Sequence, residues 1–183
     1  MKHLLLMLVA GCWATLLACG QTNPSAPAAP KTERNTAAPA GQGLRIPEKV
    51  GSVNDYEQLF SEEEEEQLAA MIQDFETRTS IEIVVVTLDS TQSTKAGFDQ
   101  QILDIGNSWG VGKKDKNNGI AIGISAGLRK IRIQNGLGIE RKLSDGQTGM
   151  IIGKYFLPQF KNGAYFEGTR QGVQAIMTHL SGG

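Results

Sequence analysis

A nearly continuous run of apolar and β-branched side chains, Ile81–Leu88, limits what this 183-residue chain can fold into. A strand with one face in water alternates apolar and polar residues, whereas this run is apolar at almost every position. That pattern is typical of a strand buried on both faces. Gly119–Ser125 is a second short apolar run. The two runs together predict an α/β protein built on a small, covered sheet.

The segments around these runs predict the order of the fold. Helical spacing of apolar residues predicts one helix over about 62–78 and a second that ends near Trp109. Strand, helix and strand in this order predict a right-handed parallel crossover. A tight turn at Ser125–Leu128 makes the next strand, Arg129–Gln134, antiparallel. Three more helical segments are expected, over about 145–154, 155–161 and 165–180. The predicted fold is a three-layer α/β/α sandwich with a small mixed β-sheet.

The acidic run Glu62–Glu66 has two interpretations. It could be an acidic recognition patch, but Ser61 with Glu64 three residues later is a capping-box pattern. Glutamates in a first helical turn also interact favourably with the helix dipole. We therefore interpret the run as the start of a helix.

The N-terminal segment predicts export. Lys2 followed by the apolar stretch Leu4–Ala18 has the pattern of a signal peptide, and at about 15 residues it is shorter than a membrane-spanning helix. Leu16-Leu17-Ala18-Cys19 resembles a bacterial lipobox, which predicts lipidation of Cys19; the alternative is simple secretion with cleavage nearby. We divide the chain into a signal peptide (1–18), a Pro/Ala-rich tether (19–45) and one globular domain (46–183).

Removal of the signal peptide narrows the available chemistry. The remaining chain has one His, His179, and its one Cys, Cys19, is expected to carry lipid, so a Cys/His zinc site and a disulfide framework are excluded. The full chain has a formal net charge of −1, and loss of Lys2 with the signal peptide changes this to −2. A chain with this net charge has no positive surface potential that would attract nucleic acid. Gly123–Gly127 fits G-x-S-x-G by letter, but a strand is expected to follow it, so a serine-hydrolase site is not predicted.

Oxygen-bearing side chains that flank the predicted strands suggest a cation site. Asp115–Gly119 taken alone has the composition of a turn. Further acidic groups stand before the first helix and after the third strand, and Ca²⁺ or Mg²⁺ would suit such ligands if the strand ends meet. The candidate ligands are Asp55, Asn117, Asn118, Glu140 and Asp145. Asp145 has an alternative role as a helix cap, for which Ser144 competes.

Several motifs in one fixed order resemble the TPM domain over about residues 46–181. They are Val53-Asn54-Asp55-Tyr56, Trp109-Gly110-Val111-Gly112, Asn118-Gly119, Arg129-Lys130-Ile131-Arg132-Ile133, Gly136-Leu137-Gly138-Ile139-Glu140, Leu157-Pro158 with Phe160, and Gly163 with Tyr165-Phe166.

The resemblance implies an α/β/α sandwich with a central sheet. Relatives include a thylakoid-lumen protein of photosystem II repair with acid-phosphatase activity, and bacterial relatives are often exported and membrane-attached. Some relatives bind divalent cations at the loops. Asn117 stands where many relatives have Asp, so the resemblance implies weaker cation binding in this chain.

Two functions remain open from the sequence. The first is a lipid-anchored, cation-binding interaction module of the bacterial cell envelope, with membrane proteins of the envelope as partners and no nucleic acid. The alternative is a weak metal-assisted acid phosphatase, in which a bound cation neutralises phosphate oxygens. We favour the first function, because no strong catalytic constellation survives loss of the signal peptide.

Overall fold

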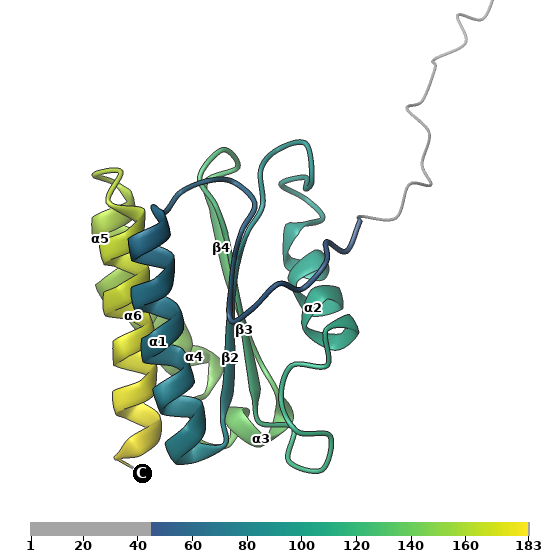
Figure 1. Ribbon diagram of the computed structural model, residues 1–183, viewed down its shortest axis with the longest axis vertical. Helices are drawn as coiled ribbons and strands as arrows, with labels where there is room; N and C mark the ends of the chain where they lie inside the picture. Colours follow the sequence, from purple (N-terminus) through teal and green to yellow (C-terminus); the bar gives the residue numbers. More distant parts are fainter. Residues whose placement is uncertain (1–44, 183) are drawn as a thin grey trace, which may run out of the picture. The chain divides into compact units, whose positions relative to one another are not determined.

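The computed structural model describes residues 45–182 (Figure 1). The predicted signal peptide, Cys19 and the tether up to residue 44 lie outside this range. None of the helices in the described range is both long enough and apolar enough to cross a membrane. In chain order the elements are β1 (Val53–Asp55), α1 (Glu62–Thr79), β2 (Glu82–Thr87), α2 (Phe98–Ser108), β3 (Gly119–Ser125), β4 (Lys130–Asn135), α3 (Leu137–Glu140), α4 (Asp145–Ile151), the π-helix η1 (Ile152–Phe156), α5 (Leu157–Phe160) and α6 (Tyr165–Ser181).

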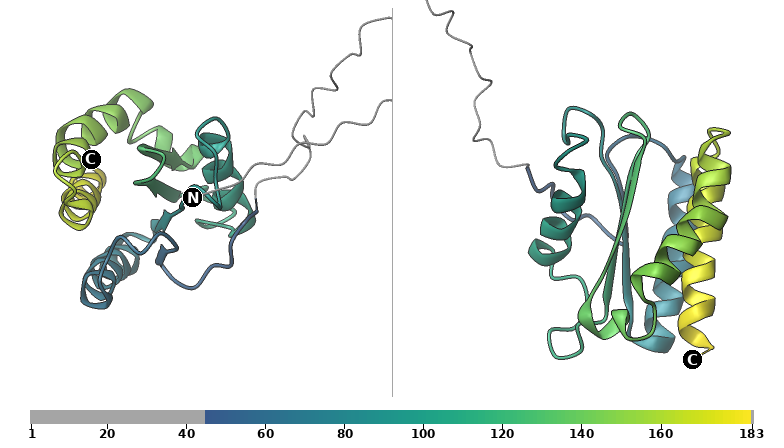
Figure 2. Two further views of the ribbon diagram at one scale, coloured as in Figure 1. Left: turned by 90° about the horizontal axis from the view of Figure 1, so that it is seen from above. Right: turned by 180° about the vertical axis from the view of Figure 1, so that it is seen from behind.

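The four strands form one mixed sheet in the order β1-β2-β3-β4. β1, β2 and β3 run parallel, and β4 returns antiparallel to β3. The predicted parallel crossover through α2 and the antiparallel return are both confirmed. α2 covers one face of the sheet, while α1, α4 and α6 cover the other, which gives the three predicted layers (Figures 1 and 2).

β2 separates two hydrophobic cores. Ile83 and Val85 point to the core under α1 and α6, and Val84 and Val86 point to the core under α2. All four side chains are at most 1% exposed. The prediction of a strand buried on both faces is confirmed, and each face of the sheet needs its own helical layer because neither face is polar.

α1 begins and ends as its sequence indicates. The Ser61 hydroxyl accepts from the Glu64 amide, and the Glu64 carboxylate accepts from the Ser61 amide at 2.9 Å. The helix ends where Ser80 adopts a left-handed conformation (φ 61°) and donates to the Glu76 carbonyl. The acidic run is therefore the capped first turn of a helix, as interpreted from the sequence.

Residues 45–50 form a strap across α2 and the edge of the sheet. The side chain of Gln101 donates to the Arg45 carbonyl at 3.0 Å, and the indole of Trp109 donates to the Pro47 carbonyl at 2.9 Å. Lys49 then forms an ion pair of 2.7 Å with Glu82 at the start of β2. These contacts fix where the described chain enters the domain.

Three features were not predicted from the sequence. β1 is short and contains Asn54 and Asp55, which have low strand propensity, so pairing with β2 decides its conformation. α3 is a single turn after β4. The two helices expected over 145–154 and 155–161 are one continuous helical stretch, because a π-turn closed by the Leu157 amide and the Ile152 carbonyl joins them.

A glycine in α6 makes room for a core side chain. A Cβ at Gly172 would lie 1.9 Å from a ring carbon of the fully buried Phe156, whereas Gly149 in α4 has open space around it. Gly172→Ala is expected to lower the free energy of unfolding by about 1–3 kcal/mol through overpacking. Gly149→Ala should raise it by about 0.5–1 kcal/mol, because Ala favours a helix interior. Urea unfolding of both variants measures the difference, and a stabilised Gly172→Ala would contradict the packing described.

Candidate functional site

The predicted cation ligands lie at two different ends of the sheet. Asp55 is level with Thr87 at the carboxyl end of the parallel strands, whereas Asn117 and Asn118 precede Gly119, which is level with Glu82. Five residues of extended β2 separate these two levels, which corresponds to about 16 Å. Asp55 is therefore not brought to the other four candidates.

Asp55 stabilises the chain around it. Its carboxylate accepts hydrogen bonds from the Thr87 hydroxyl and from the Phe60 amide, the latter at 2.8 Å. It thereby ties the end of β1 to β2 and to the loop before α1. Burial, together with the negative charges of Asp55 and Glu62, raises the pKa of Glu65 nearby.

Asn118 is also a structural residue. Its side-chain oxygen accepts from the Lys113 amide at 2.8 Å, and its amide group donates to the Ser80 carbonyl. The side chain is buried and closes the loop over residues 113–118 against the end of α1. Both polar ends of Asn118 are thus already engaged by backbone groups.

Asn117 and Glu140 lie together because two loops touch through their backbones. Asn117 has a left-handed conformation (φ 47°), and its carbonyl accepts from the Gly138 amide at 3.0 Å. A Cβ at Gly138 would lie only 2.1 Å from the Lys116 carbonyl oxygen, so only glycine permits this approach. The loop before β3 and the segment after β4, both of which carry candidate ligands, therefore do meet.

A cavity of about 280 Å³ lies beside this contact, between α2, β3, β4 and α3. Amide-bearing side chains and one carboxylate are among the residues that line it: Asn107, Asn117, Gln134 and Glu140. Asn135 also lines it, but its side-chain amide is engaged elsewhere, by the Leu143 carbonyl and the Thr148 hydroxyl. Amide and carboxylate oxygens are the donors that hard divalent cations prefer. Glu140 supplies the single carboxylate among the residues that line this cavity. In the described range no group of three or more His, Cys, Asp or Glu side chains is arranged to hold a metal ion.

Asp145 lies outside this cavity. It is the first residue of α4 and is exposed. The helix cap is Ser144, whose hydroxyl accepts from the Gln147 amide, while the Gln147 side chain accepts from the Ser144 amide at 2.9 Å. Of the two candidates for the cap, the structure selects Ser144.

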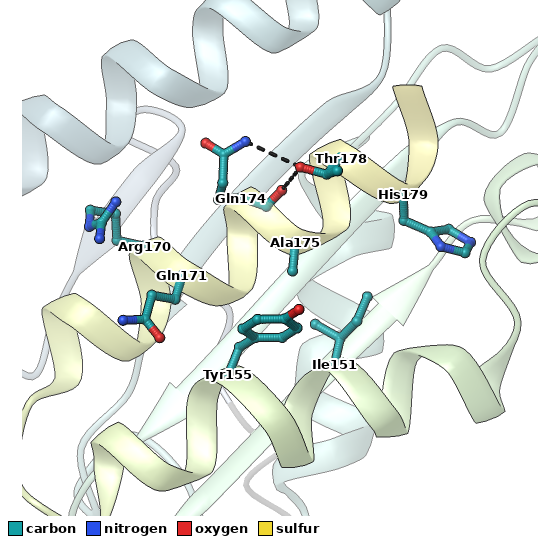
Figure 3. Close-up of a pocket in the computed structure, with 8 residues that line it drawn as sticks. All are labelled: Ile151, Tyr155, Arg170, Gln171, Gln174, Ala175, Thr178 and His179. Atoms are coloured by element: carbon teal, nitrogen blue, oxygen red, sulfur yellow. Dashed lines mark hydrogen bonds between the residues drawn. The ribbon is translucent and has the colours of Figure 1, made fainter. Parts of the chain in front are cut away.

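A larger cavity of about 560 Å³ lies between α6 and the helical stretch of α4 and η1 (Figure 3). Ile151 and Tyr155 extend from that stretch towards Ala175 on α6, with Gln171 and His179 of α6 on either side of them. His179 at one end bonds through Nε2 to the Lys142 carbonyl at 2.9 Å. The lining contains no carboxylate, so this cavity does not suit a cation.

Sequence reasoning missed the residues that organise the carboxyl end of the parallel strands. The Glu57 carboxylate accepts from the Ala126 and Gly127 amides, both at 2.8 Å, and so closes the turn between β3 and β4. The partners stand 69 and 70 positions apart, and no local pattern marks such a pair. A second group, Arg129 and Lys161, lines a cavity of about 360 Å³ beside this turn.

The sequence that builds this fold matches a known family. The family model of the TPM domain matches residues 53–179. The chain belongs to the TPM domain family. The predicted resemblance is thereby confirmed. No curated protein matches the sequence of this TPM domain protein.

Solved structures give the same result for the fold. The TPM domain is similar to the N-terminal domain of a protein from P. gingivalis, with 31% sequence identity and a TM-score of 0.65, over 72% of this chain and 82% of that chain. It is similar to BA42 from Bizionia argentinensis, with 24% identity and a TM-score of 0.59, over 69% and 84% of the two chains. The N-terminal domain of the Corynebacterium glutamicum protein cg2496 has 16% identity and a TM-score of 0.54, over 72% and 82%. The last two similarities show the fold alone.

The acidic cluster around Glu65 predicts a pH effect on the stability of the TPM domain. Since the folded-state pKa of Glu65 is raised above 4.5, its ionisation opposes folding as pH rises through that raised pKa. Glu65→Gln should therefore raise the free energy of unfolding at pH 7 and have little effect below pH 4.5. Urea unfolding at both pH values measures this, with Glu66→Gln on the exposed side of the same helix as the control. An equal gain in both variants would show that general charge reduction is the cause.

Proposed function

We propose that this TPM domain protein is an exported, lipid-anchored interaction module of the bacterial cell envelope that binds Ca²⁺ or Mg²⁺. The observation that carries the cation part is the cavity in which Asn117 and Glu140 come together with further amide-bearing side chains. The side chains of Asn117 and Glu140 carry oxygen atoms that can coordinate a cation, and both side chains are exposed to solvent. Such donors favour hard cations over zinc.

The binding is expected to be weak. A cation in this cavity meets one carboxylate, Glu140, because Asn117 supplies a neutral amide and Asn118 is engaged by backbone groups. Affinity for Ca²⁺ depends on the number of charged ligands, and extracellular modules bind with dissociation constants on the order of 10⁻⁴–10⁻³ M. A module of this affinity would be loaded outside the cytoplasm, which fits an exported protein.

The alternative function, a metal-assisted phosphomonoesterase, needs cation and phosphate at the same place. The cavity that contains Glu140 is about 16 Å along the strands from the end that carries the basic side chains of Arg129 and Lys161. This separation favours binding over turnover, and it is the reason why we propose an interaction module.

A calcium titration of the full chain tests the cation site. NMR amide shifts of residues 113–119 and 136–140 are expected to move with a dissociation constant on the order of 10⁻³ M. Asn117→Asp should tighten binding about tenfold by adding a second carboxylate, and Glu140→Gln should abolish it. Asp145→Asn removes an exposed carboxylate outside the cavity and serves as the matched control.

Two outcomes would contradict this assignment. One is a spectrum that stays unchanged at about 10⁻² M Ca²⁺, which is tenfold above the expected dissociation constant. The other is an equal loss of binding in Asp145→Asn and Glu140→Gln. Phosphate release from phenyl phosphate in the same samples would favour the phosphatase instead.

The proposed lipid anchor has its own test. The lipobox-like sequence before Cys19 predicts that the chain, expressed in a bacterium, incorporates labelled palmitate and partitions with membranes. Cys19→Ser should lose the label and release the protein to the soluble fraction, whereas Cys12→Ser should keep both properties. Label retained in Cys19→Ser would rule out this anchor and leave simple secretion.

A further inference from the structure

β4 (Lys130–Asn135) is an edge strand of the sheet. It pairs with β3 on one side, and no other strand within residues 45–182 pairs with it on its second side. In the right-hand view of Figure 2, β4 lies between α2 on one side and α4 with α6 on the other, and no helix crosses in front of it. An extended peptide can add a strand to an edge of this kind, because backbone hydrogen bonds supply the affinity.

The register shows which backbone groups of β4 have no partner in the sheet. The Gly136 amide donates at 2.8 Å to the carbonyl of Gly119, which lies directly opposite. Backbone groups alternate in direction along an antiparallel strand, so every second residue back from Gly136 also faces β3. The amides and carbonyls of Ile131 and Ile133 therefore point away from β3, towards the open edge.

A cavity of about 360 Å³ lies at the amino end of β4, between the β3–β4 turn and the helices α5 and α6. The described residues that line it include Arg129, Lys130 and Lys161 but no carboxylate. Lys130 forms an ion pair of 2.9 Å with Asp99 of α2. Within residues 45–182, neither Arg129 nor Lys161 forms a salt bridge. Two cationic groups are therefore available to an anion at this end of β4.

The turn that carries Arg129 is fixed before any ligand binds. Arg129 has a left-handed conformation (φ 54°), and its amide donates to the Ala126 carbonyl at 3.1 Å. The Glu57 carboxylate holds the Ala126 and Gly127 amides of the same turn. A guanidinium on a preorganised turn loses less freedom on binding than one on a mobile loop.

These cations set the direction of an added peptide. A peptide antiparallel to β4 ends at the amino end of β4, so its terminal carboxylate arrives beside Arg129. A parallel peptide would bring its positively charged amino terminus to the same place. Antiparallel pairing is also slightly more stable for each residue. Charge and pairing geometry therefore both select an antiparallel peptide with a free carboxyl terminus.

The wall of the cavity formed by α5 and α6 is apolar and aromatic. The rings of Phe160 and Tyr165 lie 4.8 Å apart, and Leu157 is 39% exposed beside them. Ile131 lines the same cavity from β4. A peptide residue opposite Ile131 directs its side chain to the same face of the sheet as Ile131. The wall therefore suits an apolar side chain on the last residue of the peptide.

The next position along β4 favours an acidic residue. The side chains of Ile131 and Ile133 belong to the core under α1 and α6, so Arg132 between them points to the opposite face. Arg132 is exposed and forms no salt bridge within the described range. A second copy of the chain is a poorer partner for this edge, because pairing of two β4 strands would bring Lys130 and Arg132 of both copies together.

We propose that the β4 edge and the cavity at its amino end bind the carboxyl-terminal segment of a partner protein in an extended conformation. The last residue of that segment is apolar, and the residue before it is acidic. Its terminal carboxylate contacts Arg129 and Lys161, and its backbone exchanges hydrogen bonds with Ile131 and then Ile133. This inference rests on the proposed interaction module and states the chemistry of its partner, but it does not use the cation cavity.

Titration of the full chain with acetyl-Thr-Val-Thr-Glu-Leu, which has a free carboxylate, tests the proposal in the presence of EDTA. NMR shifts are expected at the amides of residues 129–133 and 160–165. Hydrogen exchange at the Ile131 and Ile133 amides should slow on binding, whereas that of Arg132, which already faces β3, should change little. Amidation of the peptide terminus should weaken binding at least about tenfold, because it removes a charged hydrogen-bond acceptor.

Two further ligands test the backbone pairing without any change to the protein. N-methylation of the last or the third-last peptide amide, both of which face β4, should abolish binding, whereas N-methylation of the penultimate amide should leave it nearly unchanged. Octanoate has a carboxylate and an apolar body but no amides, and it should bind at least about tenfold more weakly than the peptide. Equal effects of the three methylations, or equal affinity for octanoate, would overturn pairing at the edge.

Matched variants separate recognition of the carboxylate from general charge. Arg129→Asn combined with Lys161→Gln removes both cations while Asn tolerates the left-handed backbone, and it should weaken binding at least about tenfold. Lys114→Gln combined with Lys142→Gln removes the same charge from exposed positions at the other end of the sheet and should leave binding unchanged.

Equal losses in the two double variants, or no shifts at about 10⁻³ M peptide, would overturn the proposal. Because EDTA is present, peptide binding without a response to calcium would contradict the proposed cation site alone. A response to calcium without peptide binding would contradict this inference alone.

Discussion

Burial of the central strands on both faces is the constraint on which the rest of this domain depends. β2 and β3 place alternate side chains into two separate cores, so neither face can be left to solvent. α2 covers one face and α1 with α6 the other, so the segments that connect the strands to these helices meet at the two ends of the sheet (Figure 2). Loops are confined to these ends, and the polar side chains that they carry gather there. The proposed cation site follows from this confinement.

The two ends reach their geometry by different means. At the amino end of β3, glycines at 136 and 138 allow direct backbone contact between two loops, and Asn118 holds one of them to the end of α1. At the carboxyl end, the charged side chain of Glu57 holds a tight turn through two backbone amides. The first arrangement brings acceptor oxygens to the surface. In the second, the Glu57 carboxylate is engaged by backbone amides, and Arg129 lies beside an apolar wall. The cavities at the two ends are consequently lined by charged side chains of opposite sign.

Local patterns predicted most of the fold but only part of the candidate sites. The unbroken apolar run of β2, the Ser61–Glu64 cap and the tight turn after β3 are features of neighbouring residues, and the structure agrees with each. β1 could not be found in this way, because its three residues form a strand only through pairing with β2. The same reason applies to Asp55, whose end of the sheet depends on strand order. Glu57 finds its partners about 70 positions away, where composition and spacing carry no information.

The strap formed by residues 45–50 has a mechanical consequence. Its contacts with Gln101, Trp109, Tyr56 and Glu82 follow one another along the strap, and each is a single side-chain interaction. A pull on residue 45 would load these contacts one at a time, starting at α2, before it reached the hydrogen bonds between β1 and β2. Those backbone bonds lie deeper in the fold and share a load among several partners. The strap would thus yield in small steps and protect the sheet from tension.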